Sequence, residues 1–328
     1  MLEDWVAPVL EGFDAVDNII TVSRKSKKSR LAAALNIRRN KYDVAFNLHG
    51  GTTATFFVRT SGAKYRIGLA NYQYDFLYTH RAPSPLEFWQ AEHAHSAEQQ
   101  LAVLGFAGVP VLDKPKSRLV VTEQSLKSLK EKFLAHSRTG NFAQDFLSEI
   151  DFSRSKIENR KSKIALFHPT AAFDTKQWAT ENFTRVAEFL FDKGLRTIAV
   201  ATRKERGVLE TLQRTSRVPI HVFDDLTLPE ITALASRARI FIGNDSGIAH
   251  IAAAVETPSV VIFGSSNINH WRPWTNAPNE IVFERLDCQP CAGFVCGKFD
   301  QAECIRRVTI DQVTDAAQRI LDMTAEQI

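Results

Sequence analysis

Five short runs rich in Ile, Val and Phe recur through the second half of the sequence, and each of the first four is followed by a longer amphipathic run. The apolar runs are KIALFHP, RTIAVA, IHVF, RIFIGND and SVVIFG, and the helical patterns between them begin near Thr180, Lys204, Leu228 and Ser246. Strands that alternate with helices are typical of a parallel sheet with helices on both faces. We therefore predict an α/β fold with a complete doubly wound sheet in this half.

The first half shows the same alternation less clearly. DNIITV and YDVAFNLHG predict strands, AEHAHSAEQQLAVLG predicts a helix ended by Gly105, and TEQSLKSLKEKFLAHS predicts another with Thr122 as its N-cap. The chain turns polar and irregular between about residues 137 and 163. We therefore predict two domains, residues 1–155 and 156–328. The last helix, TIDQVTDAAQRILDM, is a candidate to pack back on the N-terminal domain.

Length and composition exclude several classes of protein. The chain has 328 residues, enough for two domains, and its 44% hydrophobic and 24% charged residues are typical of a globular protein. No segment approaches the roughly 18 to 20 uncharged apolar residues of a membrane span. The first residues, MLEDWVAPVLEG, lack the basic region of a secretory signal. A cytoplasmic protein is therefore expected.

Basic residues gather in one early segment that contains no acid. They are Arg24, Lys25, Lys27, Lys28, Arg30, Arg38, Arg39 and Lys41. Such a block can attract an anionic lipid or a phosphorylated acceptor. The alternative is a solvated helix face without a partner. Nucleic acid is not expected, because no aromatic residues are interleaved with the cations.

The segment GNDSGIAH follows a predicted strand and opens a helix. Ligands of open α/β sheets bind beyond the carboxyl ends of the strands, where a helix start offers N–H groups to an anion. Ser246, Gly247 and Ile248 are therefore candidates to cradle a phosphate, and Asp245 is placed to accept hydrogen bonds from sugar hydroxyls. In the alternative interpretation, Asp245 or Ser246 only caps the helix and His250 packs beneath it.

The segment HPTAAFDTKQW follows another predicted strand. Its Lys176 can reach a diphosphate as a compact point charge, and Thr170 in the same loop is a candidate to line the ligand cleft. Trp178 could equally belong to the core, and a single loop lysine is usually solvated. Since both loops leave the same edge of one sheet, Lys176 and the helix start at Ser246 are expected to converge on one dianionic group.

Asn47, His49 and Gly50 lie at the end of the strand YDVAFNLHGG. The glycines would let the loop approach a ligand closely, and Asn47 or His49 could contact a sugar. The alternative is a glycine turn with an incidental histidine.

All four cysteines, Cys288, Cys291, Cys296 and Cys304, fall in one short stretch. Their spacing is compatible with a structural tetrathiolate site for zinc or an iron–sulfur cluster. Free or redox-active thiols are a second interpretation. Disulfides, which a reducing cytoplasm disfavours, are a third.

The two donor loops, together with VAPVLEGFDAVDNII, YDVAFNLHGG and HSAEQQLAVLG in that order, resemble glycosyltransferase family 9, the ADP-heptose lipopolysaccharide heptosyltransferases, over nearly the whole chain. The resemblance implies a GT-B fold in which two Rossmann-like domains face a cleft. It also implies that Lys176 and the backbone of Ser246, Gly247 and Ile248 bind the donor diphosphate, and that Asp245 binds the transferred sugar.

By the same resemblance, the reaction is an inverting transfer of heptose from ADP-heptose to a lipopolysaccharide core acceptor at the cytoplasmic face of the inner membrane. A base takes the proton of the attacking hydroxyl, and positive groups stabilise the departing diphosphate. The sequence contains no Asp-x-Asp motif for a metal-held diphosphate. No cofactor is therefore expected for catalysis.

The family's opening strand and S-x-x-G-D loop, whose Asp is the expected general base, have no counterpart before Leu2. LEDWVAPVLEG predicts a strand end and a short helix, so the N-terminal domain is expected to be incomplete. Either the start has been placed too late, or the chain is a paralogue that binds donor and transfers sugar poorly. Glu3, Asp4 and His49 are candidate substitutes for the base.

Other functions stay open from the residues alone. A nucleotide-sugar epimerase shares this two-domain fold and would need acid and base residues around one bound sugar. A regulatory protein would bind the donor and transfer no sugar. A nicotinamide-dependent oxidoreductase is disfavoured, because no G-x-G-x-x-G follows a predicted strand.

Overall fold

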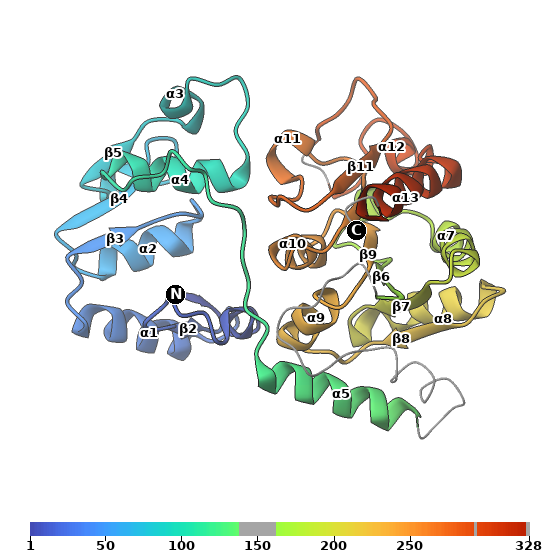
Figure 1. Cartoon of the computed structure of the whole chain (residues 1–328). Coiled ribbons are helices and arrows are strands. Elements are labelled where there is room, and N and C mark those ends of the chain that lie inside the picture. Colours follow the sequence, from blue (N-terminus) through green and yellow to red (C-terminus); the bar gives the residue numbers. More distant parts are fainter. Residues whose placement is uncertain (138–161, 292–293, 326–328) are drawn as a thin grey trace. The chain divides into compact units, whose positions relative to one another are not determined.

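A computed structural model describes residues 1–137, 162–291 and 294–325, and the chain divides into two compact units (Figure 1). The N-terminal unit comprises Met1–Pro8, Asp14–Pro115 and Asn269–Trp271. The C-terminal unit comprises Val9–Phe13, Lys116–Ile268 and Arg272–Ile328. Each unit has its own sheets and its own hydrophobic cores.

The C-terminal unit is built on a parallel sheet of six strands in the order β11-β10-β9-β6-β7-β8. The strands are β6 (Ile164–His168), β7 (Arg196–Val200), β8 (Ile220–Phe223), β9 (Ile240–Asn244), β10 (Ser259–Phe263) and β11 (Asn279–Phe283). The first five confirm the apolar runs predicted from the sequence. The sixth was not predicted: β11 is an edge strand that begins with the half-buried Asn279 and Glu280, so it lacks the continuous apolar run of an inner strand.

Helices cover both faces of this sheet (Figure 1). They are α5 (Glu123–Ser137), α7 (Thr180–Asp192), α8 (Arg206–Thr215), α9 (Leu228–Ala235), α10 (Gly247–Ala254), α12 (Glu303–Arg306) and α13 (Ile310–Ala325), with the 3-10 turns η4 (Asp174–Lys176) and η5 (Arg203–Glu205). Successive strand side chains point to opposite faces. Phe167 of β6 therefore lies in the core shared with α7, α8 and α13, whereas Leu166 lies in the core shared with α5, α9 and α10.

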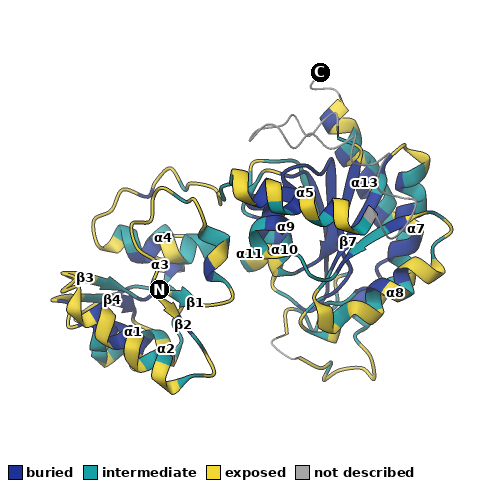
Figure 2. Cartoon of the chain, turned by 90° about the horizontal axis from the view of Figure 1, so that it is seen from below, coloured by how far each residue is buried: buried dark blue, intermediate teal, exposed yellow. Residues whose placement is uncertain are grey.

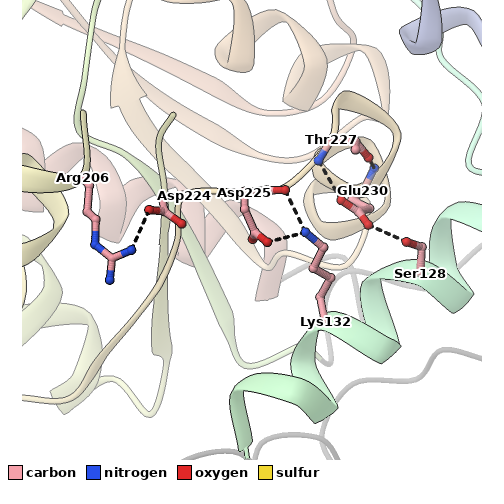
Figure 3. A network of polar contacts seen from close by, with 7 residues as sticks. All are labelled: Ser128, Lys132, Arg206, Asp224, Asp225, Thr227 and Glu230. Atoms are coloured by element: carbon pink, nitrogen blue, oxygen red, sulfur yellow. Dashed lines mark hydrogen bonds and ion pairs between the residues drawn. The ribbon is translucent and has the colours of Figure 1, made fainter. Parts of the chain in front are cut away.

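Helix α5 belongs to the C-terminal unit, which corrects the predicted domain boundary at residue 155. Its apolar stripe, Leu126, Leu129 and Phe133, is buried in the core that α9 also covers. Figure 3 shows the polar contacts that accompany this packing: Lys132 donates to the carbonyl of Asp225 at 2.8 Å and also pairs with its carboxylate. The boundary therefore falls between Pro115 and Lys116. The helix itself was predicted, and Thr122 does accept from the Ser125 N–H at 3.1 Å.

The apolar face of α13 packs against other elements of the C-terminal unit. Val313, Ala316 and Ile320 lie in the core with β10 and α7. These contacts lie within the C-terminal unit, and packing of this helix against the N-terminal domain stays a prediction.

The N-terminal unit contains two small parallel sheets, β1-β2 and β3-β4-β5. The strands are β1 (Leu2–Glu3), β2 (Thr21–Val22), β3 (Val44–Phe46), β4 (Tyr65–Leu69) and β5 (His80–Ala82); the helices are α1 (Lys27–Arg39), α2 (Thr52–Thr60), η2 (Asp75–Leu77), α3 (Pro85–Trp89) and α4 (Ser96–Phe106). Two short helices, η1 (Ala7–Leu10) and α11 (Ile268–Trp271), have residues in both units. Helix α4 was predicted, but it runs through Gly105 to Phe106. Its N-cap is the buried His95, whose Nδ1 accepts from the Ala97 N–H at 3.0 Å.

Exposure differs between the elements of the two units. Figure 2 shows buried residues throughout the C-terminal sheet and exposed residues along one side of α1. Within the part of the chain that the structure describes, no helix is long and apolar enough to cross a membrane.

Candidate functional site

The two loops that the sequence singled out leave adjacent strands at the same edge of the C-terminal sheet. Strands β6 and β9 are parallel neighbours, with His168 opposite Gly243. The segment from Pro169 to Lys176 follows β6, and the segment from Asp245 to Ser246 follows β9. Their side chains therefore meet beyond the carboxyl ends of the strands, where open α/β sheets bind ligands.

Lys176 and Asp245 form an ion pair at this edge. The Lys176 Nζ lies 2.8 Å from Asp245 Oδ2, and the Lys176 and Asp245 side chains are 21% and 6% exposed. The Ser266 hydroxyl donates to the same carboxylate oxygen. Lys176 thus lies beside Asp245, the residue before the N-cap of α10, and its convergence with the helix start on a dianionic group stays a prediction.

Two further contacts fix the loop that carries Lys176. The Ser265 N–H donates to the Thr175 carbonyl at 3.2 Å, and a Cβ added to Gly264 would lie 2.1 Å from that carbonyl oxygen. Only glycine fits this approach. The turn η4 is thereby held against the end of β10.

The side-chain amide of Asn244, the last residue of β9, links the ends of the two loops. Its Oδ1 accepts from the Trp178 N–H at 3.0 Å, and its Nδ2 donates to the Pro169 carbonyl at 2.9 Å. Asn244 is fully buried, and Trp178 is 1% exposed with its indole N–H bonded to the Val308 carbonyl at 2.8 Å. Trp178 is therefore a core residue, the alternative that the sequence left open, and Asn244 is a structural residue that sequence reasoning missed.

The start of α10 is not capped by a side chain among the described residues. Ser246 is the N-cap in extended conformation, but its hydroxyl makes no cap hydrogen bond. It lies 3.1 Å from His168 Nδ1 instead. A Cβ added to Gly247 would meet no described atom within 4 Å. The N–H groups of the first turn are thus available to an anion, as helix starts commonly are.

Two histidines next to these loops are held neutral. Burial lowers the pKa of His168 to about 4, against the opposing effect of the Glu205 carboxylate. Burial also lowers the pKa of His250, where Asp245 opposes the shift and Lys176 adds to it. His250 therefore lies close to the Lys176–Asp245 pair. Thr170 is fully buried and 3.2 Å from His168 Nε2, so it serves the interior rather than an open cleft.

The predicted residues of the N-terminal unit form a turn. Asn47 is 1% exposed, and its Oδ1 accepts from the N–H groups of His49 at 3.1 Å and Gly50 at 2.9 Å. Gly50 has a φ of +80°, and a Cβ there would lie 2.6 Å from the ring of Tyr72. Asn47 and Gly50 thus shape the turn after β3, and only His49 is exposed.

The cysteine stretch shows no metal centre among the described residues, since no three His, Cys, Asp or Glu side chains are grouped to hold an ion. All four thiols are free, with Cys304 buried and Cys291 exposed. Burial raises the pKa of the Cys304 thiol, and the nearby thiols of Cys291, Cys288 and Cys296 raise it further. A bound metal at this stretch stays a prediction.

Comparison with known proteins identifies the family and the fold. The sequence model of glycosyltransferase family 9 (heptosyltransferase) matches residues 30–298. A search of curated protein sequences finds no match. Among solved structures, the family 9 glycosyltransferase of Veillonella parvula matches with a TM-score of 0.73 at 18% identity, covering 98% of this chain and 87% of that one.

Two Escherichia coli enzymes match over a similar extent. ADP-heptose lipopolysaccharide heptosyltransferase II has a TM-score of 0.73 at 16% identity, covering 100% of this chain and 89% of its own. The heptosyltransferase WaaC with ADP has a TM-score of 0.65 at 15% identity, covering 98% and 89%. These matches show a GT-B-like α/β fold, as predicted. Since the family model spans more than half of the sequence, the chain belongs to glycosyltransferase family 9, the heptosyltransferases.

Proposed function

We propose that this chain is an inverting, metal-independent glycosyltransferase that moves heptose from ADP-heptose to a lipopolysaccharide core acceptor. The observation that carries the proposal is the Lys176 ammonium, 2.8 Å from the Asp245 carboxylate at the uncapped start of α10. A fixed cation and free N–H groups suit a diphosphate, and a neighbouring carboxylate suits sugar hydroxyls. The heptosyltransferase relatives support the choice of donor.

The proposed reaction is a direct displacement at the anomeric carbon. The acceptor hydroxyl oxygen attacks the anomeric carbon, the bond from that carbon to the diphosphate oxygen breaks, and ADP leaves with the electron pair. A general base takes the hydroxyl proton. Lys176 and the N–H groups of Ser246, Gly247 and Ile248 stabilise the charge on the leaving diphosphate, so no metal is needed for that task.

Donor binding is tested by calorimetric titration of the parent chain and Lys176→Ala with ADP and ADP-heptose. Loss of a hydrogen bond to a charged group should weaken both ligands about tenfold to a hundredfold. Lys193→Ala is the matched control, because Lys193 is exposed and follows the end of α7. Equal affinity of Lys176→Ala and the parent for ADP would remove the diphosphate role.

Transfer is tested separately with a heptose-deficient core acceptor. Mass spectrometry should show the acceptor gain one heptose, with formation of ADP. Binding of ADP-heptose without any transfer would instead support a catalytically impaired donor-binding paralogue. An exchange of donor sugars without acceptor would favour an epimerase.

For the acceptor side, we propose that α1 contacts the anionic inner-membrane surface from the cytoplasm. The helix contains no acid, and its exposed cations are Lys27, Lys28, Arg38 and Arg39. Leu31 and Leu35, 63% and 48% exposed, lie on the same side as these cations. Cations around exposed apolar side chains suit an anionic bilayer, which attracts each cation and takes up the leucines.

Vesicle sedimentation tests this contact. Changing Lys27, Lys28, Arg38 and Arg39 to Gln should release the chain from vesicles with one third phosphatidylglycerol and leave its affinity for ADP unchanged. The control removes the same charge elsewhere, at the exposed Lys130, Lys193, Lys204 and Arg214. If both variants lose vesicle binding equally, the contact depends on net charge and not on α1.

A further inference from the structure

Two phenylalanines lie next to Lys176 and have no role in the function proposed so far. Phe173 belongs to the loop that carries Lys176, and Phe294 belongs to the stretch after β11. Their ring centroids are 4.4 Å apart, with an angle of 74° between the ring planes. The Lys176 Nζ lies 5.5 Å from the centroid of the Phe173 ring. Together, Phe173 and Phe294 form an aromatic platform beside the cation.

Most of the Phe294 side chain is open to solvent. It is 65% exposed, whereas Phe173 is half-buried. A single exposed phenylalanine on a surface needs no explanation. Phe294 differs because its ring rests edge-to-face on a ring of the Lys176 loop, a geometry that aromatic pairs prefer. A supported apolar surface is therefore open to a ligand at this place.

A backbone hydrogen bond attaches the stretch after β11 to the loop after β10. The Cys291 N–H donates to the Ser265 carbonyl at 3.0 Å. The next residue of that loop, Ser266, donates to the Asp245 carboxylate. The stretch that bears Phe294 is thus anchored to the same loop that holds Asp245.

The order of the strands determines which part of a donor lies beside the aromatic platform. Lys176 and Asp245 follow β6 and β9, with β10 and β11 on one side of these strands and β7 and β8 on the other. A nucleotide-sugar carries its sugar and its nucleoside at opposite ends of the diphosphate. Because Asp245 is held from the β10 side, the proposed sugar position and the aromatic platform share that side. The nucleoside is left to the side of β7 and β8.

We infer that the aromatic platform packs against the C–H face of the transferred sugar, and that Phe294 is a specificity-determining residue for a donor that carries a sugar. The inference rests on the proposed function, since it takes a nucleotide-sugar as the donor. A sugar ring has hydroxyls around its rim and C–H groups on its faces. Ligand sites combine aromatic surface with a few polar groups that fix orientation. Here Asp245 accepts from the rim, and Phe294 covers a face.

Calorimetric titration with ADP and with ADP-heptose tests the aromatic platform. Phe294→Ala should weaken ADP-heptose about two- to tenfold, the range for one aromatic contact, and leave ADP unchanged. Phe299→Ala is the matched control, because Phe299 is a 38% exposed phenylalanine of the same stretch, and it should change neither affinity. If Phe294→Ala weakens ADP and ADP-heptose equally, the platform serves the nucleotide and the inference is overturned. Unchanged affinity for both ligands overturns it as well.

Two further substitutions separate an aromatic face from apolar bulk. Phe294→Trp keeps an aromatic face, so the parent's ratio of the two dissociation constants should persist. Phe294→Leu keeps apolar volume without such a face, and the ratio should change as in Phe294→Ala. A parental ratio in Phe294→Leu would refute the stacking. A structural role would instead lower the melting temperature and weaken both ligands together, which also overturns the inference.

Failure of the proposed function gives a different result. If the parent chain binds neither ADP nor ADP-heptose, the donor assignment itself is wrong and the inference falls with it. If the parent binds both and the Phe294 variants keep its ratio of dissociation constants, the donor assignment stands and the role of the aromatic platform is wrong.

Discussion

The buried His168 should make the stability of the chain fall as the pH decreases from 7 to 5. Burial lowers its pKa from the ordinary 6.5 to about 4, so the folded chain stays unprotonated there while the unfolded chain takes up a proton. This stability is present above the unfolded pKa and is lost as the pH falls towards the folded pKa. The difference between the two pKa values, about 2.5, corresponds to about 3 kcal/mol in the free energy of unfolding. About 2 kcal/mol of this is lost between pH 7 and pH 5.

Urea unfolding of the parent and His168→Gln at pH 7, 6 and 5 measures this loss. The variant should be less stable at pH 7, because it loses the bond to Ser246, but its stability should fall about 2 kcal/mol less between pH 7 and pH 5. His221, whose pKa is also lowered to about 4 by burial and then by His136, provides a comparison on β8. His221→Gln should reduce the loss of stability between pH 7 and pH 5 by a similar amount, and the effects of the two substitutions should add. A His168→Gln variant that loses stability as steeply as the parent would refute the reasoning.

Three further predictions concern the same unit. Asn244→Ala should destabilise the chain by about 2 to 4 kcal/mol in urea unfolding, since it leaves the buried Trp178 N–H and Pro169 carbonyl without their partner, and a change below about 0.5 kcal/mol would contradict this. Gly264→Ala should both destabilise the chain and weaken ADP, because its Cβ would meet the Thr175 carbonyl, whereas Gly247→Ala, which meets open space, should keep the parent's stability. For the cysteine stretch, elemental analysis of the purified protein should find about one zinc or iron per chain, and Cys288→Ser should remove it. Four thiols that react with Ellman's reagent in a metal-free protein would favour the free-thiol interpretation instead.

The fold was largely predictable because inner parallel strands are buried on both faces. Strands β6, β9 and β10 are buried at every position, so they stand out as unbroken apolar runs. The edge strand β11 and the partner of α5 were missed for a common reason. A partly polar strand does not show which sheet edge it joins. An apolar stripe predicts that a helix face is buried but not which surface covers it, as for Leu126, Leu129 and Phe133 of α5.

The site was predictable as far as sheet topology goes. Loops that leave the carboxyl ends of adjacent parallel strands lie close together. Lys176 and Asp245 therefore lie side by side although 69 residues separate them. The contacts of Asn244 with Trp178 and Pro169, and of His168 with Ser246, were not predictable. These partners lie 66 to 78 residues away, and the contacts depend on the depth at which each side chain is buried. A polar residue at the end of an apolar strand, such as His168, was the only available signal.

The ion pair between Lys176 and Asp245 also bears on the entropy of donor binding. A free lysine side chain loses up to about 2 kcal/mol of conformational entropy when it is immobilised. Here the ammonium is already held at 2.8 Å by a carboxylate that is itself bonded to Ser266. Asp245 thus holds the Lys176 side chain in place before the donor binds. Most of the conformational entropy of this side chain is therefore already lost in the free protein, and binding costs less.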